Sequence, residues 1–270
     1  MALDIQFAQG SRGAPCVFVF LMAVSFAALA EPATNSIFAA RAEMEFHRAQ
    51  AWFQSDTNDP AAAWQFARAC FDFADFATND TQRADVARQG IGACRELLAR
   101  DTNCAPGHYY LAMNFGQLAR AEAPSLAAYK LVREMEREFK TAAGLDGNFD
   151  YAGPARSLGL LYRDAPKWPF SIGSRRKARE WLEQAAKLAP DYPDNRLNLF
   201  ESHLQWREHA EAKHDLQILE ALWPKAQTNF TGEAWERSWA DWTARKAAAE
   251  QSLAQPPQPP QPTEPPKSQH

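Results

Sequence analysis

Apolar residues recur every three to four positions through most of the chain, which is the period of an amphipathic α-helix. The first such pattern spans residues 36–54, where Phe38, Phe46 and Phe53 fall on one face. Asp59-Pro60 then has the form of a helix start, with aspartate as the N-cap and proline in the first turn. We therefore predict an all-α protein that opens with a leading helix within residues 31–58.

The clearest pattern is a pair of helices within residues 155–190. Leu158, Gly159 and Tyr162 place a large, a small and an aromatic side chain on one face, which a partner helix can approach closely. The partner helix has a small-large-small stripe and a terminal proline, formed by Ala178, Leu182, Ala185 and Pro190. Two helices patterned in this way are expected to pack against each other as a hairpin.

These offsets resemble the tetratricopeptide repeat (TPR), a helix hairpin with a Leu-Gly pair, an aromatic residue and a terminal proline. Equivalent positions are Leu111, Leu158 and Leu199, spaced 47 and then 41 residues apart. The resemblance implies about four hairpin units within residues 59–230, stacked into a right-handed superhelix that binds other molecules without catalysis. The fourth unit departs from the pattern, because Phe200 stands where a small residue is typical. We expect Pro224 to end its second helix.

The chain after the repeats changes character twice. Residues 231–254 carry Trp235, Trp239 and Trp242 on one helical side and predict a helix that caps the open end of the array. An aromatic face for a ligand or a membrane surface is the alternative. Residues 255–270 are rich in proline and glutamine, so we expect a disordered, extended tail that serves as a spacer or docks a proline-reading partner.

Residues 1–30 have the pattern of a secretory signal peptide. An apolar run at 17–29 ends in Ala28-Leu29-Ala30, a small-x-small cleavage site. The run of about 13 residues is shorter than the roughly 18 to 20 that a membrane span needs. We therefore expect cleavage after Ala30, a periplasmic or secreted protein, and no membrane span after signal removal.

Composition and motifs argue against several classes of function. The 270 residues carry a net charge of −4 without a run of basic residues, so we expect no nucleic-acid partner. No phosphate loop, nucleophile elbow or metal motif is present, and we predict no enzyme, no catalytic residue, no cofactor and no metal. The spacing of His203, His209 and His214 does not align two imidazoles on one helix face. Cys16 would leave with the signal peptide, so an odd number of cysteines remains: Cys70, Cys94 and Cys104. We expect them to be small core residues, with one disulfide as the alternative.

The third unit has a long loop, residues 164–173, that includes Trp168 and Phe170. With Gly153 to Tyr162 before it, this region resembles the TPR-like T-component of bacterial TRAP uptake systems. That resemblance implies a periplasmic protein that binds a transporter's solute-binding subunit or a small apolar ligand. It leaves open whether the chain forms a homo-oligomer, and it makes Trp168 and Phe170 candidate ligand contacts.

The TPR resemblance also implies a concave face lined by the first helix of each unit. The candidate binding residues on that face are Tyr109, Met113, Arg156, Leu160, Arg163 and Glu201. Arg156 and Arg163 are seven residues apart on one face, where they could hold a carboxylate, or each could pair with Asp150 or Asp164. We predict an exported scaffold for a protein or peptide partner. The alternative is a transport accessory protein for a small, partly apolar ligand.

Overall fold

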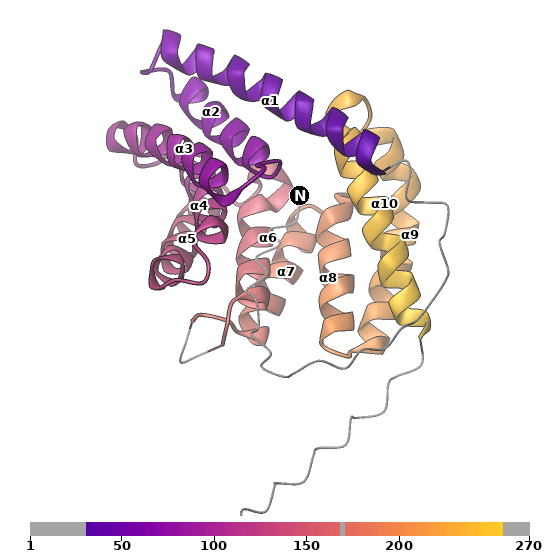
Figure 1. The fold of residues 1–270 in the computed structure, drawn as a ribbon. Helices are drawn as coiled ribbons and strands as arrows, with labels where there is room; N and C mark the ends of the chain where they lie inside the picture. The colour runs from indigo at the N-terminus through magenta and orange to yellow at the C-terminus, as the bar shows by residue number, and fades with distance from the viewer. Residues whose placement is uncertain (1–30, 168–170, 256–270) are drawn as a thin grey trace, which may run out of the picture.

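The fold is a series of antiparallel helix hairpins. A computed structural model describes residues 31–167 and 171–255, and within these ranges the chain forms ten helices (Figure 1). Their bounds are α1 Glu31–Ser55, α2 Pro60–Ala74, α3 Asp80–Arg100, α4 Ala105–Ala121, α5 Leu126–Leu145, α6 Phe149–Asp164, α7 Arg175–Leu188, α8 Pro193–Gln205, α9 His209–Asn229 and α10 Glu233–Ala254. The predicted all-α array of helix hairpins is confirmed.

Local sequence sets where the helices begin. The side chain of Asp59 accepts a hydrogen bond from the Ala61 amide, and Pro60 occupies the first turn of α2, as the sequence predicted. Asn79 and Ser125 cap α3 and α5 in the same way. Such caps satisfy amide groups that a helix start otherwise leaves unpaired.

The pairing of helices shows which side of the array is concave. The hairpins are α2/α3, α4/α5, α6/α7 and α8/α9, and α1 precedes them by packing on α2. Contacts also join α2 to α4, α4 to α6, α6 to α8 and α8 to α10, whereas the described parts of α3, α5, α7 and α9 have no comparable contacts with one another. Helices on the inside of a curve lie closer together than those outside. The even-numbered helices therefore form the inner row, and α10 continues it.

The apolar core is divided into two main parts. One joins α2 to α7 and includes Phe71, Phe115 and Phe139; the other joins α8, α9 and α10 around Phe200 and Trp242. Between them, the α6 to α8 contact is slight. The seam between the two cores runs where α6 and α7 meet α8. A small apolar cluster of Leu160, Leu182, Ala186 and Leu199 fills part of it, and polar side chains occupy the part at the beginning of α6.

Two local expectations need correction or completion. Pro224 does not end the fourth hairpin: it lies inside α9, which continues to Asn229. A proline near a helix end removes a single hydrogen bond, and here burial of Leu222 and Ala226 holds the helix on both sides of it. Phe200 is fully buried in the C-terminal core, so the large side chain fills the space between α8 and its neighbours.

The two ends of the array meet. Arg41 of α1 lies 2.9 Å from Glu233 and 2.5 Å from Glu236, both on α10. Arg237 of α10 lies 3.0 Å from Asp75 at the end of α2, and its guanidinium is 4.5 Å from the centre of the Phe76 ring. Figure 1 shows the first turns of α1 beside the beginning of α10. Charged side chains therefore close the curved array.

We expect Arg237→Glu to open this closure, because it places a carboxylate beside Asp75. Partly exposed ion pairs contribute about 0 to 1 kcal/mol each, so the change should increase the radius of gyration in small-angle X-ray scattering without unfolding the helices. The double variant Arg237→Glu, Asp75→Arg should restore the wild-type radius. An unchanged radius in the single variant would contradict a closed array held by these pairs.

Candidate functional site

Most of the predicted binding residues lie inside the packed structure. Tyr109, Met113, Arg156 and Leu160 are only 2 to 3% exposed, because the inner helices pack closely against one another. They offer little surface to a partner, which would instead contact their neighbours. Arg163 and Glu201 of the inner row are partly accessible, and binding by them remains a prediction. Trp168 and Phe170 lie outside the described residues.

The beginning of α6 contains an unusual stretch of backbone. Asp150, Tyr151 and Ala152 have φ angles of 50°, 54° and 63°, in the left-handed region that residues other than glycine seldom occupy. Each such residue costs about 1 to 2 kcal/mol of strain. Three in succession persist only where the surroundings hold them, and such strain is common at functional sites. We call residues 150–152 the left-handed turn.

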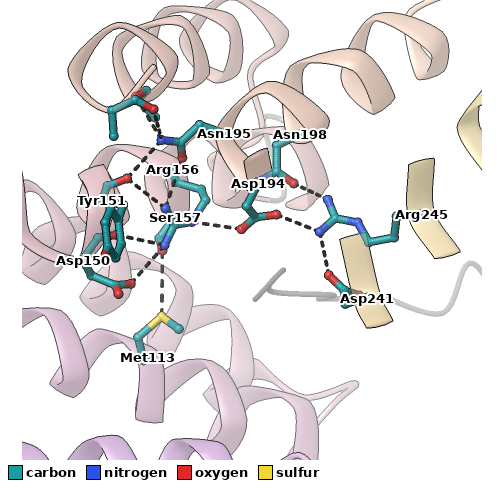
Figure 2. A network of polar contacts seen from close by, with 12 residues as sticks. Met113, Asp150, Tyr151, Arg156, Ser157, Asp194, Asn195, Asn198, Asp241 and Arg245 are labelled. Atoms are coloured by element: carbon teal, nitrogen blue, oxygen red, sulfur yellow. Dashed lines mark hydrogen bonds and ion pairs between the residues drawn. The ribbon is translucent and has the colours of Figure 1, made fainter. Parts of the chain in front are cut away.

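The Arg156 side chain lies beside this turn and holds it through hydrogen bonds (Figure 2). Its guanidinium donates to the Tyr151 carbonyl at 3.1 Å, to the Asp150 carbonyl at 3.3 Å and to the Asp150 carboxylate at 3.0 Å. Asn195 of α8 also donates to the Tyr151 carbonyl, at 3.0 Å. The alternative in which the two predicted arginines pair with nearby aspartates is confirmed, since Arg163 lies 2.6 Å from Asp164.

The polar network continues from Arg156 to α10. Asp194 is fully buried, 3.3 Å from Arg156 and 2.8 Å from Arg245. Burial opposes ionisation of Asp194, but positive charge that includes Arg245 and Arg156 holds its pKa well below the usual range. Arg245 also contacts Asn198 and Glu201. The network therefore ties the turn, α8 and the capping helix together across the seam between the two cores.

Aromatic rings gather on both sides of the left-handed turn. Phe149, just before it, packs edge-on against Trp64 of α2 at a centroid distance of 6.1 Å. Tyr151, within it, stacks on Tyr192 at 4.6 Å and contacts Trp235 of α10 at 5.7 Å. Tyr151 is 42% exposed, and Trp64, Phe149 and Trp235 are half-buried. Among the described residues no ring contact joins the Trp64–Phe149 pair to the Tyr151–Trp235 pair, and we call Tyr151 and Trp235 the aromatic strip.

The sequence reasoning placed Trp235 on an aromatic face of the cap but missed the rest of the strip. Its signal was Phe149-Asp-Tyr151, two aromatic residues at a helix start, separated by Ala152 from Gly153-Pro154. If residues 150–152 are assumed to be ordinary helix or strand, Phe149 and Tyr151 are not expected to pack in two different aromatic clusters. The strip depends on the left-handed turn, which no periodicity in the sequence reveals.

A charged pair belongs to the same inner face. Asp72 of α2 is about one-third exposed and lies 3.7 Å from Arg68. Burial raises its pKa to about 6, an effect that Arg68 and Arg237 oppose and that Asp75 and Asp150 reinforce. Asp72 therefore changes charge in a mildly acidic range, within the curve of the array.

We expect Asp72→Asn to raise the free energy of unfolding at pH 7 to 8. A carboxyl group with a raised folded-state pKa favours the fold when protonated, so its contribution is complete below its ordinary pKa and is lost as the pH rises through about 6. The variant should match wild type below about pH 4, where both side chains are neutral. Urea unfolding from about pH 3 to 8 checks this, and an NMR titration of Asp72 with a midpoint near 4 would contradict it.

Other candidate chemistry has structural roles in the described residues. Cys70 and Cys94 are buried, as predicted for core residues, and all three described cysteines are free thiols. His203 lies 2.6 Å from Asp215 and is buried between α8 and α9. Among residues 31–167 and 171–255, no group of three or more metal-ligating side chains comes together.

A groove lies between α8 and the last turns of α10. It has a volume of about 360 Å³. Its lining combines charged, polar and apolar side chains: Glu201, Leu204, Gln205, Arg245, Ala248, Ala249 and Ser252. No helix in the described ranges combines the length and apolar character needed to cross a bilayer.

Comparison with known proteins identifies the fold. No protein-family model and no curated protein sequence matches the chain. A solved structure does: a thermophilic TPR protein of Thermus thermophilus, with a TM-score of 0.55 and 18% sequence identity over 82% of this chain and 96% of that one. At this identity the likeness establishes architecture alone. The chain therefore has the fold of a tetratricopeptide-repeat protein.

Proposed function

We propose that this chain is an exported, periplasmic scaffold without catalytic activity, and that its inner face binds an extended segment of a protein partner. The observation that carries the proposal is the aromatic strip, which places exposed Tyr151 on a rigid support within the curve of the helices. Rigid aromatic side chains supply contact area with little loss of conformational freedom, and they are enriched where proteins bind each other. Asp72 and Arg68, which interact electrostatically with Asp150 of the left-handed turn, add polar groups to this face.

Capture from a periplasmic extract tests the proposal. Wild-type protein should retain a partner that Tyr151→Ala, Trp235→Ala releases. Trp52→Ala is the matched control, because Trp52 is 40% exposed on α1, close to the 42% of Tyr151. Loss of the partner from both variants, or from neither, would place binding elsewhere. N-terminal sequencing of the periplasmic protein should begin at Glu31.

The groove between α8 and α10 supports a second candidate. Its volume of about 360 Å³ falls within the range of small-molecule sites, which extends from about 300 to 1,000 Å³. Leu204 and Ala248 offer apolar surface and Arg245 a charge, which suits a small, partly apolar ligand of an uptake system. Mass spectrometry of the native protein should then detect a bound solute that Ala248→Trp displaces. A chain that purifies without any solute would contradict this candidate.

A further inference from the structure

The aromatic strip has ring surface that no described residue covers. Tyr151 is held on one side by the stacked ring of Tyr192 and at its edges by Phe230 and Trp235, yet 42% of it remains exposed. The left-handed turn fixes the orientation of this ring. An occupant of the strip therefore meets a preformed surface and does not have to order it.

Flat aromatic surfaces of this kind suit proline. Proline rings pack on the faces of tyrosine and tryptophan, and a proline-rich segment is already close to the extended polyproline II conformation, so it loses little entropy on binding. This chain contains such a segment directly after α10. Residues 255–270 carry seven prolines, among them the pairs Pro256-Pro257, Pro259-Pro260 and Pro265-Pro266.

We propose that the aromatic strip binds the proline-rich C-terminal segment of this same chain, so that the segment occupies the inner face until a partner displaces it. The inference rests on the proposed function for the binding face. Occupancy of that face by the segment itself requires no second protein. It also gives a role within the molecule to a segment that composition alone describes as a spacer or as a ligand for a proline-reading partner.

The length of the segment defines which prolines reach the strip within one molecule. From Trp235 to Gln255 the helix rises by about 30 Å, at about 1.5 Å per residue. A polyproline II segment advances about 3.1 Å per residue, so about ten residues are needed to return. A tail that reverses directly after Gln255 would therefore bring Pro265-Pro266 to the level of Trp235 along α10.

Charge supports the same register. Lys267 follows these two prolines. Asp72 and Asp150 lie in the same electrostatic neighbourhood on the inner face, and their side chains are 32% and 33% exposed. An ammonium group that arrives there meets carboxylates that water still reaches. Lys267 is therefore complementary to these acids, and Glu264, which precedes the two prolines, is complementary to Arg68 and Arg237 beside Asp72.

Photocrosslinking of the purified full chain tests the proposal. With p-benzoylphenylalanine in place of Tyr151, irradiation should join residue 151 to a peptide from residues 255–270, as mass spectrometry would show. The same substitution at Trp52 is the control, since it also replaces an exposed aromatic ring, and should give no such adduct. An adduct of monomer mass indicates the tail of the same molecule, and one of dimer mass indicates the tail of a second copy. Absence of the adduct at residue 151 overturns the proposal.

A binding measurement provides an independent readout. A chain in which all seven tail prolines are replaced by alanine has a free strip and should bind a fluorescent peptide of residues 255–270 in an anisotropy titration. Adding Trp235→Ala should weaken this binding about tenfold, as loss of a central aromatic contact typically does. The unmodified chain should bind the peptide more weakly than the alanine-tail chain, because its own tail competes. Equal binding by all three chains would refute occupancy of the strip. Partner capture from the periplasm could still succeed, so the two failures are distinguishable.

Discussion

Arg156→Met is expected to lower the free energy of unfolding by about 3 kcal/mol, the range found when one partner of a buried ion pair is removed. The guanidinium is 3% exposed, and it serves the carbonyls of Asp150 and Tyr151 and the carboxylate of Asp194. Methionine fills similar volume but donates no hydrogen bond, so the left-handed turn loses its main support. Urea unfolding followed by circular dichroism measures the change.

A matched control separates this effect from a general loss of charge. Arg176→Met removes an exposed arginine that pairs, within the described part of the chain, with Glu180 one turn away on α7, and it should change stability by about 0.5 kcal/mol or less. Arg156→Lys should recover little, because one ammonium cannot reproduce a planar fork that reaches several acceptors. Equal losses of stability in Arg156→Met and Arg176→Met would contradict the role of Arg156 in holding the left-handed turn.

Gly159→Ala is expected to destabilise the third hairpin by about 1 to 3 kcal/mol, the usual cost of overpacking a core. A Cβ atom at this position would lie 2.5 Å from the Leu182 Cγ and 3.1 Å from the Leu182 backbone nitrogen. Helices α6 and α7 would have to separate, and backbone cannot move aside as a flexible side chain does. Thermal or urea unfolding reports the loss.

Gly92→Ala is the matched control within α3. A Cβ atom added at Gly92 would have no neighbouring atom within 4 Å, and alanine is favoured over glycine inside a helix by about 0.5 to 1 kcal/mol. We therefore expect the two glycine substitutions to have opposite signs. A stabilising Gly159→Ala would mean that α6 and α7 do not approach as closely as the structure shows.

The helical-repeat fold could be predicted because its signals are local. Leu158, Gly159 and Tyr162 set a close helix crossing, and Gly159 does contact Leu182 across the hairpin. The caps at Asp59 and Ser125 follow from short-range hydrogen bonding. Pro224 misled the prediction because tertiary burial of its neighbours outweighed the single hydrogen bond that proline removes.

The candidate site was less accessible to sequence reasoning. Repeat offsets placed Tyr109, Met113, Arg156 and Leu160 on the inner row but could not show how tightly that row packs, and these side chains are buried. The exposed rings come instead from the turn before α6, where non-glycine residues adopt left-handed backbone. Backbone propensity disfavours the left-handed conformation at residues 150–152. Predicting it therefore requires knowledge of the tertiary contacts that hold it.

The sequence by itself determined the helices, their pairing into hairpins and the order of the units, since these follow from periodicity and from contacts between chain neighbours. Tertiary structure alone decided that Arg156 and Asn195 would hold a strained turn, that Trp64 and Trp235 would meet rings on either side of it, and that the ends would close through Arg237 and Asp75. Apart from the hydrogen bonds of Arg156, which reach five and six residues back along the chain, these contacts join residues 44 to 162 positions apart. These contacts form because all the hairpins together give the array its curvature. No local pattern in the sequence encodes that curvature.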